Sequence, residues 1–170
     1  MENLIHLIET YFIGERIESV IFIVTGCIAL LLASFFLFII KYSFFKGMAI
    51  PFLVIGLLQL SVGINVYNLT LKGIERVSHL MKQDSQKLKT VEIPRMKKVL
   101  KNFTIYKWIE ISLIACALIL FIKFYSSPQT YWKGLALGLL IQTSIMLSLD
   151  IVAEQRGEIY FEKLQEINKP

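Results

Sequence analysis

Two long stretches without a charged residue constrain this chain more than any other feature of its sequence. They cover residues 20–40 and 47–71. Each can cross the hydrocarbon core of a bilayer, which is about 30 Å thick and takes roughly 20 helical residues to span. The composition agrees, because 55% of the 170 residues are hydrophobic and only 18% are charged. The sequence therefore predicts an integral membrane protein.

Two shorter apolar runs predict two further crossings. The uncharged run 111–122 reaches spanning length only as residues 106–125, which include three charged side chains. The uncharged run 134–149 reaches it only as residues 132–152, which include two. The expected fold is all-α: a four-helix transmembrane protein made of two helical hairpins, with helical extensions in the cytoplasm.

The apolar and charged stretches divide the chain into five predicted segments. A short amphipathic helix that ends at Gly14 is expected to lie in the membrane interface. The segments are 1–16 (interfacial helix), 17–71 (first transmembrane hairpin), 72–105 (cytoplasmic amphipathic connector), 106–153 (second transmembrane hairpin) and 154–170 (cytoplasmic helical tail).

The connector has the pattern of an amphipathic helix. Apolar residues recur at three- and four-residue spacing from Gly73 to Val91, which predicts that the second crossing helix continues that far. Pro94 is expected to interrupt it, since proline has no amide proton to donate. Apolar positions of the connector are Ile74, Val77, Leu80, Met81, Leu88 and Val91. The helical arms either pack on one another as a small bundle or offer this stripe to a partner.

The distribution of basic residues predicts the orientation. Four crossings place fourteen of the 18 lysines and arginines on the side of the two termini and the connector, and four on the side of the hairpin turns. Basic loops stay preferentially in the cytoplasm. We therefore expect a multi-pass protein of the plasma (inner) membrane with both termini cytoplasmic.

The two halves of the chain resemble each other. The sequence Phe45-Lys-Gly-Met-Ala-Ile opens the second crossing, and Trp132-Lys-Gly-Leu-Ala-Leu opens the fourth. Glu18 and Glu110, each after an isoleucine, stand at the starts of the first and third crossings. These similarities indicate an internal duplication of one hairpin, as in parallel-repeat transporters. The alternative is chance similarity between apolar sequences that draw on few residue types.

Four polar residues near the cytoplasmic boundary are candidate functional groups. Counted inward from the outer lysines at about 1.5 Å per residue, Glu110 and Asp150 lie about 20 and 25 Å deep, with Asn65 and Glu18 close to the boundary. An acidic side chain at such depth should turn toward protein, water or a cation. One possibility is that Glu110 and Asp150 bind or relay a cation or proton. The other is that they form buried ion pairs with Lys107, Arg76 or Arg156.

Small residues at regular spacing predict close helix contacts. Small side chains let membrane helices approach each other. The expected packing positions are Gly134 and Gly138, Ala29 and Ala33, and Gly56 and Gly63. Polar residues such as Gln59 and Gln142 either hydrogen-bond between helices or line a pathway.

A basic cluster follows the connector toward the third crossing. Its members are Lys87, Lys89, Arg95, Lys97, Lys98, Lys101 and Lys107. It is either a solvated face that obeys the positive-inside rule or a contact for anionic lipid head groups, assigned to Lys97, Lys98 and Lys101. Nucleic acid is not expected as a partner, because no nucleic-acid-binding fold or aromatic platform accompanies the charges.

Enzyme chemistry finds little support in the sequence. The two histidines, His6 and His79, lie outside the apolar runs, and no metal, phosphate-loop or nucleophile motif is present. We expect no cofactor, no metal site and no catalysis. The favoured function is a non-catalytic accessory, assembly or immunity-type module that acts through helix contacts with itself or another membrane protein. The alternative is an oligomeric channel, or an ion- or proton-coupled carrier that uses the intramembrane carboxylates.

Overall fold

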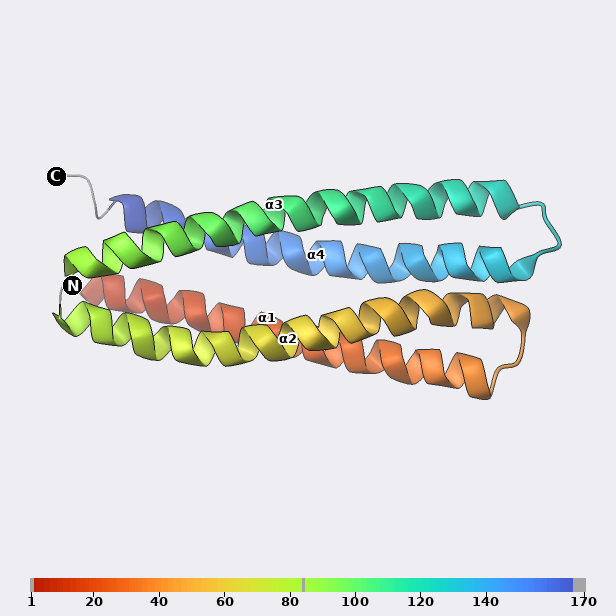
Figure 1. Cartoon of the computed structure of the whole chain (residues 1–170), viewed down its shortest axis with the longest axis horizontal. Coiled ribbons are helices and arrows are strands. Elements are labelled where there is room, and N and C mark those ends of the chain that lie inside the picture. The colour runs from red at the N-terminus through yellow and green to blue at the C-terminus, as the bar shows by residue number, and fades with distance from the viewer. Residues whose placement is uncertain (1, 84, 167–170) are drawn as a thin grey trace.

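The chain forms four long α-helices joined by short turns in a computed structural model (Figure 1). The helices are α1 (Glu2–Phe38), α2 (Ser43–Gln83), α3 (Ser85–Phe124) and α4 (Thr130–Glu166). The structure describes residues 2–83 and 85–166, without the side chains of 2–5, 78, 80–83 and 85–89. The predicted all-helical class is confirmed, and each of these four helices contains a stretch long and apolar enough to cross a membrane.

The two hairpins lie side by side, and α2 and α4 form the contact between them. α1 packs against α2, and α3 packs against α4, so that α1 and α3 occupy the flanks (Figure 1). α2 and α4 both run from the hairpin turns toward the end that carries the chain termini. These central helices therefore pack in parallel.

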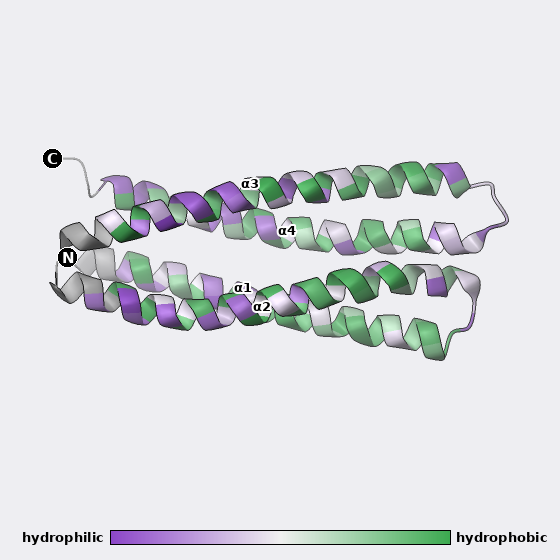
Figure 2. Cartoon of the chain, viewed as in Figure 1, coloured by the Kyte–Doolittle hydropathy of each residue, from purple (hydrophilic) through white to green (hydrophobic). Residues whose placement is uncertain are grey.

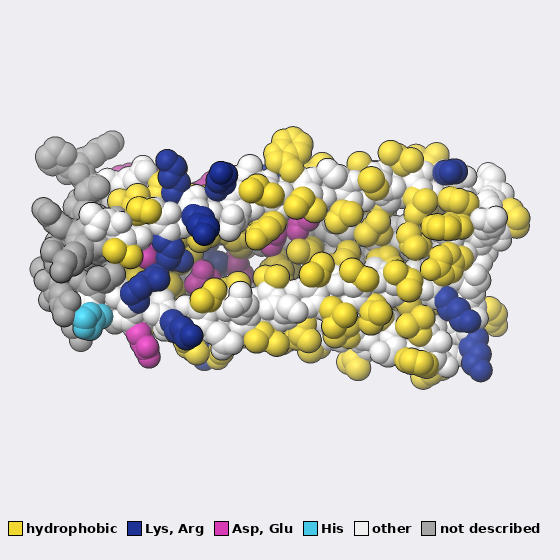
Figure 3. All heavy atoms as spheres, viewed as in Figure 1, with side chains coloured by type: hydrophobic (Ala, Val, Ile, Leu, Met, Phe, Trp, Pro, Cys, Tyr) yellow, Lys and Arg dark blue, Asp and Glu magenta, His cyan; other side chains and the backbone are white. Residues whose placement is uncertain are grey.

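Hydropathy divides the length of the molecule into two halves. The half next to the hairpin turns is predominantly apolar, and the half next to the termini is rich in charged residues (Figure 2). The space-filling view shows apolar side chains over the first half and a band of lysines and arginines over the second (Figure 3). We call the four helix segments of the charged half the arms.

The four arms pack on one another. One apolar cluster joins all four helices and consists of Ile8, Tyr11, Phe12, Val77, Met96, Tyr160 and Leu164. Met96 and Val77 are fully buried, and the Tyr11 and Tyr160 rings stack at 4.2 Å. The arms thus form a small bundle, the first of the two arrangements that the sequence allowed. The connector side chains Leu80, Met81 and Leu88 lie outside the described residues.

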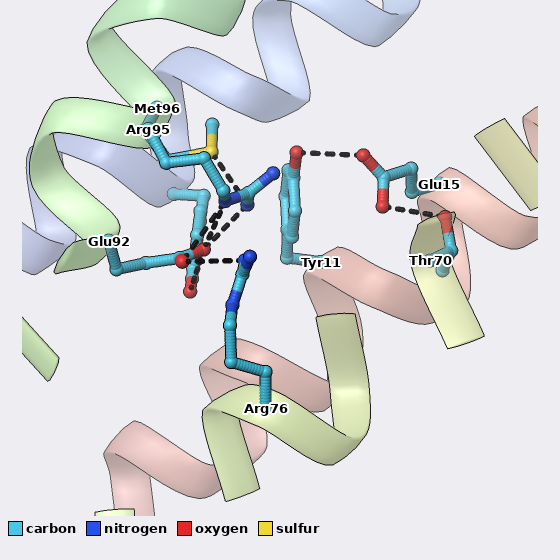
Figure 4. Close-up of polar contacts among 8 residues, drawn as sticks. Tyr11, Glu15, Thr70, Arg76, Glu92, Arg95 and Met96 are labelled. Carbon is cyan, nitrogen blue, oxygen red and sulfur yellow. Dashed lines mark hydrogen bonds and ion pairs between the residues drawn. The ribbon is translucent and has the colours of Figure 1, made fainter. Parts of the chain in front are cut away.

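A buried carboxylate gives the arm bundle a polar centre (Figure 4). Glu92 of α3 has no exposed surface, and Arg95 donates to both of its oxygens at 2.5–3.0 Å. Arg76 of α2 approaches the same carboxylate at 3.3 Å, and the Tyr160 hydroxyl of α4 donates to it at 3.4 Å. Glu92 therefore connects three of the four arms.

α1 is continuous through Gly14, so the predicted end of a separate interfacial helix at that residue is wrong. The physical reason for the glycine is a close contact. The Arg156 side chain of α4 passes over it, and a Cβ at Gly14 would lie 2.6 Å from Arg156 Cδ. Gly14 thus makes room for a neighbouring side chain inside a long helix.

The boundary between the second and third helices also differs from the expected one. The second helix ends at Gln83, before Val91, and Pro94 lies inside α3 without ending it. A proline inside a helix is unfavourable by about 3 kcal/mol relative to alanine. Glu92 and Met96 on either side of Pro94 are fully buried, and their packing outweighs that cost.

Two glycines set the distance between α2 and α4 in a reciprocal way. A Cβ on Gly47 would overlap the carbonyl oxygen of Tyr131, and a Cβ on Gly134 would overlap that of Phe44. Phe44 and Tyr131 each lie three residues before the glycine of their own helix. The contact therefore has approximate two-fold symmetry about an axis parallel to the two helices.

Candidate functional site

Glu110 of α3 and Asp150 of α4 face each other between the two helices of the second hairpin. Their carboxyl groups lie close enough to interact electrostatically. Glu110 is 2% exposed and Asp150 is 8% exposed. Both oxygens of Glu110 are buried, and no hydrogen-bond donor reaches them from the described residues. The group opposite Glu110 is thus another carboxyl, which can donate only if it carries a proton.

The basic residues expected beside this pair bind other carboxylates. Lys107 pairs with Glu154 at 2.5 Å. Arg156 donates through both terminal nitrogens to Glu18, one of these bonds being 2.6 Å long.

Arg76, the third expected partner, pairs with Glu92 in the arm bundle. In the described residues none of Lys107, Arg76 and Arg156 forms its ion pair with Glu110 or Asp150. The reason is that the packing of the helices decides which carboxylate each cation can reach. Each of these cations lies nearer to a carboxylate other than Glu110 and Asp150, and the linear sequence does not show this.

The layer around the pair contains more acids than bases among the described residues. Its carboxyl groups are Glu18, Glu110, Asp150 and Glu154, and its bases are Lys107 and Arg156. Each base is already paired with one acid. Two neighbouring buried carboxyls disfavour a state in which both are ionised. A proton or a small cation between them would therefore stabilise the pair.

The position of the pair fits the boundary between the apolar and charged halves. Glu110 lies fourteen residues from the end of α3 at Phe124, which corresponds to about 21 Å along the helix. Acidic side chains are visible in the seam between the hairpins, where the apolar surface gives way to the basic band (Figure 3).

The other two predicted acid-or-amide positions do not join the pair. Glu18 is part of the bidentate ion pair with Arg156, which connects α1 to α4. Asn65 is exposed on α2. The site residues Glu110 and Asp150 are thus brought together, whereas Asn65 is not.

Most of the predicted packing residues lie between α1 and α2. Ala29 and Ala33 are buried in a cluster with Met48 and Phe52. A Cβ on Gly56 would lie 3.0 Å from Ala29 Cβ, and one on Gly63 would lie 2.9 Å from the Ser19 carbonyl oxygen.

Gly134 and Gly138 instead face α2. A Cβ on Gly138 would lie 2.8 Å from the Met48 carbonyl oxygen. On the same side of α4, the Gln142 side-chain nitrogen donates to Gln59 Oε1 at 2.7 Å, and both residues are buried. The amide pair thus joins the two hairpins inside the apolar half.

Two buried acids were not singled out from the sequence. Glu154 follows Asp150 by four residues, so the helical period alone places both on one face of α4. Glu92 has no comparable signal, because its arginine partners are common in a basic connector. Both acids are at most 8% exposed. The part of the chain that the structure describes contains no group of three His, Cys, Asp or Glu residues that could hold a metal ion.

Comparisons with known proteins identify no relative of this chain. No protein-family model matches the chain, no curated protein matches it, and no solved structure matches it. The functional argument therefore rests on the chain's own geometry.

Proposed function

We propose that this chain is a proton-coupled membrane protein, a small carrier or channel whose working site is the Glu110–Asp150 pair. The observation that supports this proposal is that two buried carboxyls lie near each other while Lys107 and Arg156 bind other acids. Ionisable residues inside membrane segments often mark ion or proton pathways. The pair would take up one proton from the side of the arms and release it as the hairpins move.

A proton fits the site better than a larger ligand does. Glu110 is almost fully buried, so a lysine or arginine from a partner protein could not reach it through the lipid-facing surface. A metal ion would want more oxygen or nitrogen ligands than two carboxyls supply. A shared proton needs only the two groups that are present.

Proton flux into proteoliposomes tests the proposal. The purified chain is reconstituted around a pH-sensitive dye, and a potassium diffusion potential drives protons inward. We expect wild type to acidify the lumen and both Glu110→Gln and Asp150→Asn to lose most of that flux. Glu158→Gln, which changes an exposed acid of α4, is the matched control and should behave as wild type. Equal flux in wild type and both site variants, or no flux in any of them, would reject the proposal.

A second candidate is a non-catalytic accessory, assembly or immunity-type module that acts through helix contacts. Its support is the large uncovered apolar surface of α3, where Ile119 is 67% exposed and Ile122 is 73% exposed. A photocrosslinker at Ile119 in native membranes should then capture one defined membrane protein, whereas lipid adducts alone would argue against this function. The same photocrosslinker placed at Ile28 of α1 provides the control position.

The orientation and the repeat belong to the same proposal. Both termini and the arms lie in the cytoplasm of a plasma-membrane protein, as the distribution of basic residues favours. The two hairpins derive from one duplicated unit. The reciprocal approach of Gly47 to Tyr131 and of Gly134 to Phe44 supports this origin, because equivalent residues make equivalent contacts.

A further inference from the structure

The basic cluster of α3 divides into paired and free side chains. Arg95 binds Glu92, and Lys107 binds Glu154. Lys87 and Lys89 have side chains outside the described residues. The remaining members are exposed and take part in no ion pair within the described part of the chain: Lys97, Lys98 and Lys101. Three lysine charges are therefore available to an outside ligand.

These lysines continue into an aromatic and apolar stripe on the same face of the helix. Lys97, Lys101 and Trp108 follow one another at four- and seven-residue spacing, which keeps them on one side of an α-helix. Trp108 is 65% exposed, and the apolar positions Ile119 and Ile122 farther along α3 are more exposed still. α3 packs against α4 with a small contact to α2, so this outer face is uncovered by the other described helices.

The order along this face matches the order of groups in a phospholipid. Ammonium groups lie beyond the apolar half, an indole ring lies at its edge, and isoleucines follow at the depth of the acyl chains. Tryptophan favours the head-group level of a bilayer. We propose that Lys97, Lys98, Lys101 and Trp108 bind the head group of an anionic phospholipid, whose acyl chains lie along the outer face of α3.

Quenching of Trp108 fluorescence by brominated lipids tests this site. The chain has two tryptophans, and Trp132→Phe removes the other one. This variant is reconstituted in phosphatidylcholine vesicles that contain an equal fraction of either brominated phosphatidylglycerol or brominated phosphatidylcholine. We expect stronger quenching by phosphatidylglycerol. A lysine near an anionic surface contributes about a fivefold preference, so each Lys→Gln change should lower the relative affinity by about that factor.

The matched variants separate a site from a general surface charge. Lys97→Gln, Lys98→Gln and Lys101→Gln combined should bring the two lipids to equal quenching. Lys163→Gln, an exposed lysine at the far end of α4, should leave the preference intact. Because the three lysines are exposed, their loss should leave the helical circular dichroism unchanged, and Lys101→Gln alone gives a milder version of the same test.

Three results would overturn the assignment. They are equal quenching by both lipids in the parent chain, an unchanged preference in the triple variant, and loss of the preference at about 0.15 M salt, where exposed charges beyond about 8 Å are screened. The inference is independent of proton coupling. Glu110→Gln should keep the lipid preference even where it abolishes flux, so failure of one proposal is distinguishable from failure of the other.

Discussion

At the scale of single residues, the ion pairs of Lys107 and Arg156 determine which carboxyl groups are left without a basic partner. Both cations lie close to the Glu110–Asp150 pair in sequence, and both bind other acids. This leaves two neighbouring carboxyls without a basic partner, which under the proposed function share a proton. A stability measurement can detect that proton without any transport assay.

Asp150→Asn should make the folded protein less sensitive to alkaline pH. Under the proposed function the folded pair of the wild type holds a proton that the unfolded chain gives up, so stability should fall as the pH rises and that proton is lost. An asparagine amide can donate to Glu110 and remove the repulsion. We expect the melting temperature in detergent to decline from mildly acidic to mildly alkaline pH in wild type and to decline less in the variant. A parallel decline in both proteins would contradict the shared proton.

Glu92→Gln should loosen the arm bundle. The substitution keeps the shape of the side chain and removes the charge that Arg95 and Arg76 bind, and a hydrogen bond to a charged group contributes about 1.5–3 kcal/mol. We expect the free energy of unfolding to fall by about 2 kcal/mol. This value already allows for solvent screening at the two partly exposed arginines. Backbone amide hydrogens of the arms should exchange faster in the variant than in wild type, and this increase should be larger in the arms than in the apolar half. Exchange as slow as in wild type would mean that the apolar cluster alone holds the arms.

At the scale of helices, the glycine contact between α2 and α4 holds the hairpins together. Gly134→Ala would insert a methyl group against the Phe44 carbonyl, which is backbone and cannot move aside as a side chain can. Such overpacking costs about 1–3 kcal/mol. We expect a lower unfolding midpoint in detergent titration. Ser144→Ala, at an exposed position of the same helix, should have little effect, and equal midpoints for the two variants would argue against this contact.

The sequence predicts the helices better than it predicts their ends. Long apolar runs identify the four helices, two of them without any charged residue and two only when a few charged residues are included. The boundary between α2 and α3 escapes detection because apolar residues keep the same spacing on both sides of it. Pro94 gives a misleading signal, because burial of Glu92 and Met96 holds the helix together across it.

The candidate site was only half predictable. Depth along the helix identifies Glu110 and Asp150 as residues that should face inward. Their contact with each other is a property of how α3 packs on α4. The ion pair between Lys107 and Glu154 also depends on that packing. From the sequence alone, any acid of the layer is an equally good partner for Lys107.

At the scale of the whole molecule, the orientation can be tested with reporters. A phosphatase that is active only outside the cytoplasm should be inactive when fused after Pro170 and active when inserted between Ser126 and Gln129 in the α3–α4 turn. The reason is the excess of basic residues at the arm end. The opposite pattern of activities would show that the arms face outward, and the proton would then enter from that side.

The continuity of the four helices has a mechanical consequence. Each has 37–41 residues and is thus roughly 60 Å long, about twice the thickness of the hydrocarbon core. Such a rod can turn about the level at which it leaves the apolar half, close to Glu110 and Asp150. With roughly 30 Å of helix beyond that level, a tilt of a few degrees moves the distal tip by about 1–3 Å, so under the proposed function a hydrogen ion gained or lost at the pair would change the spacing of the tips.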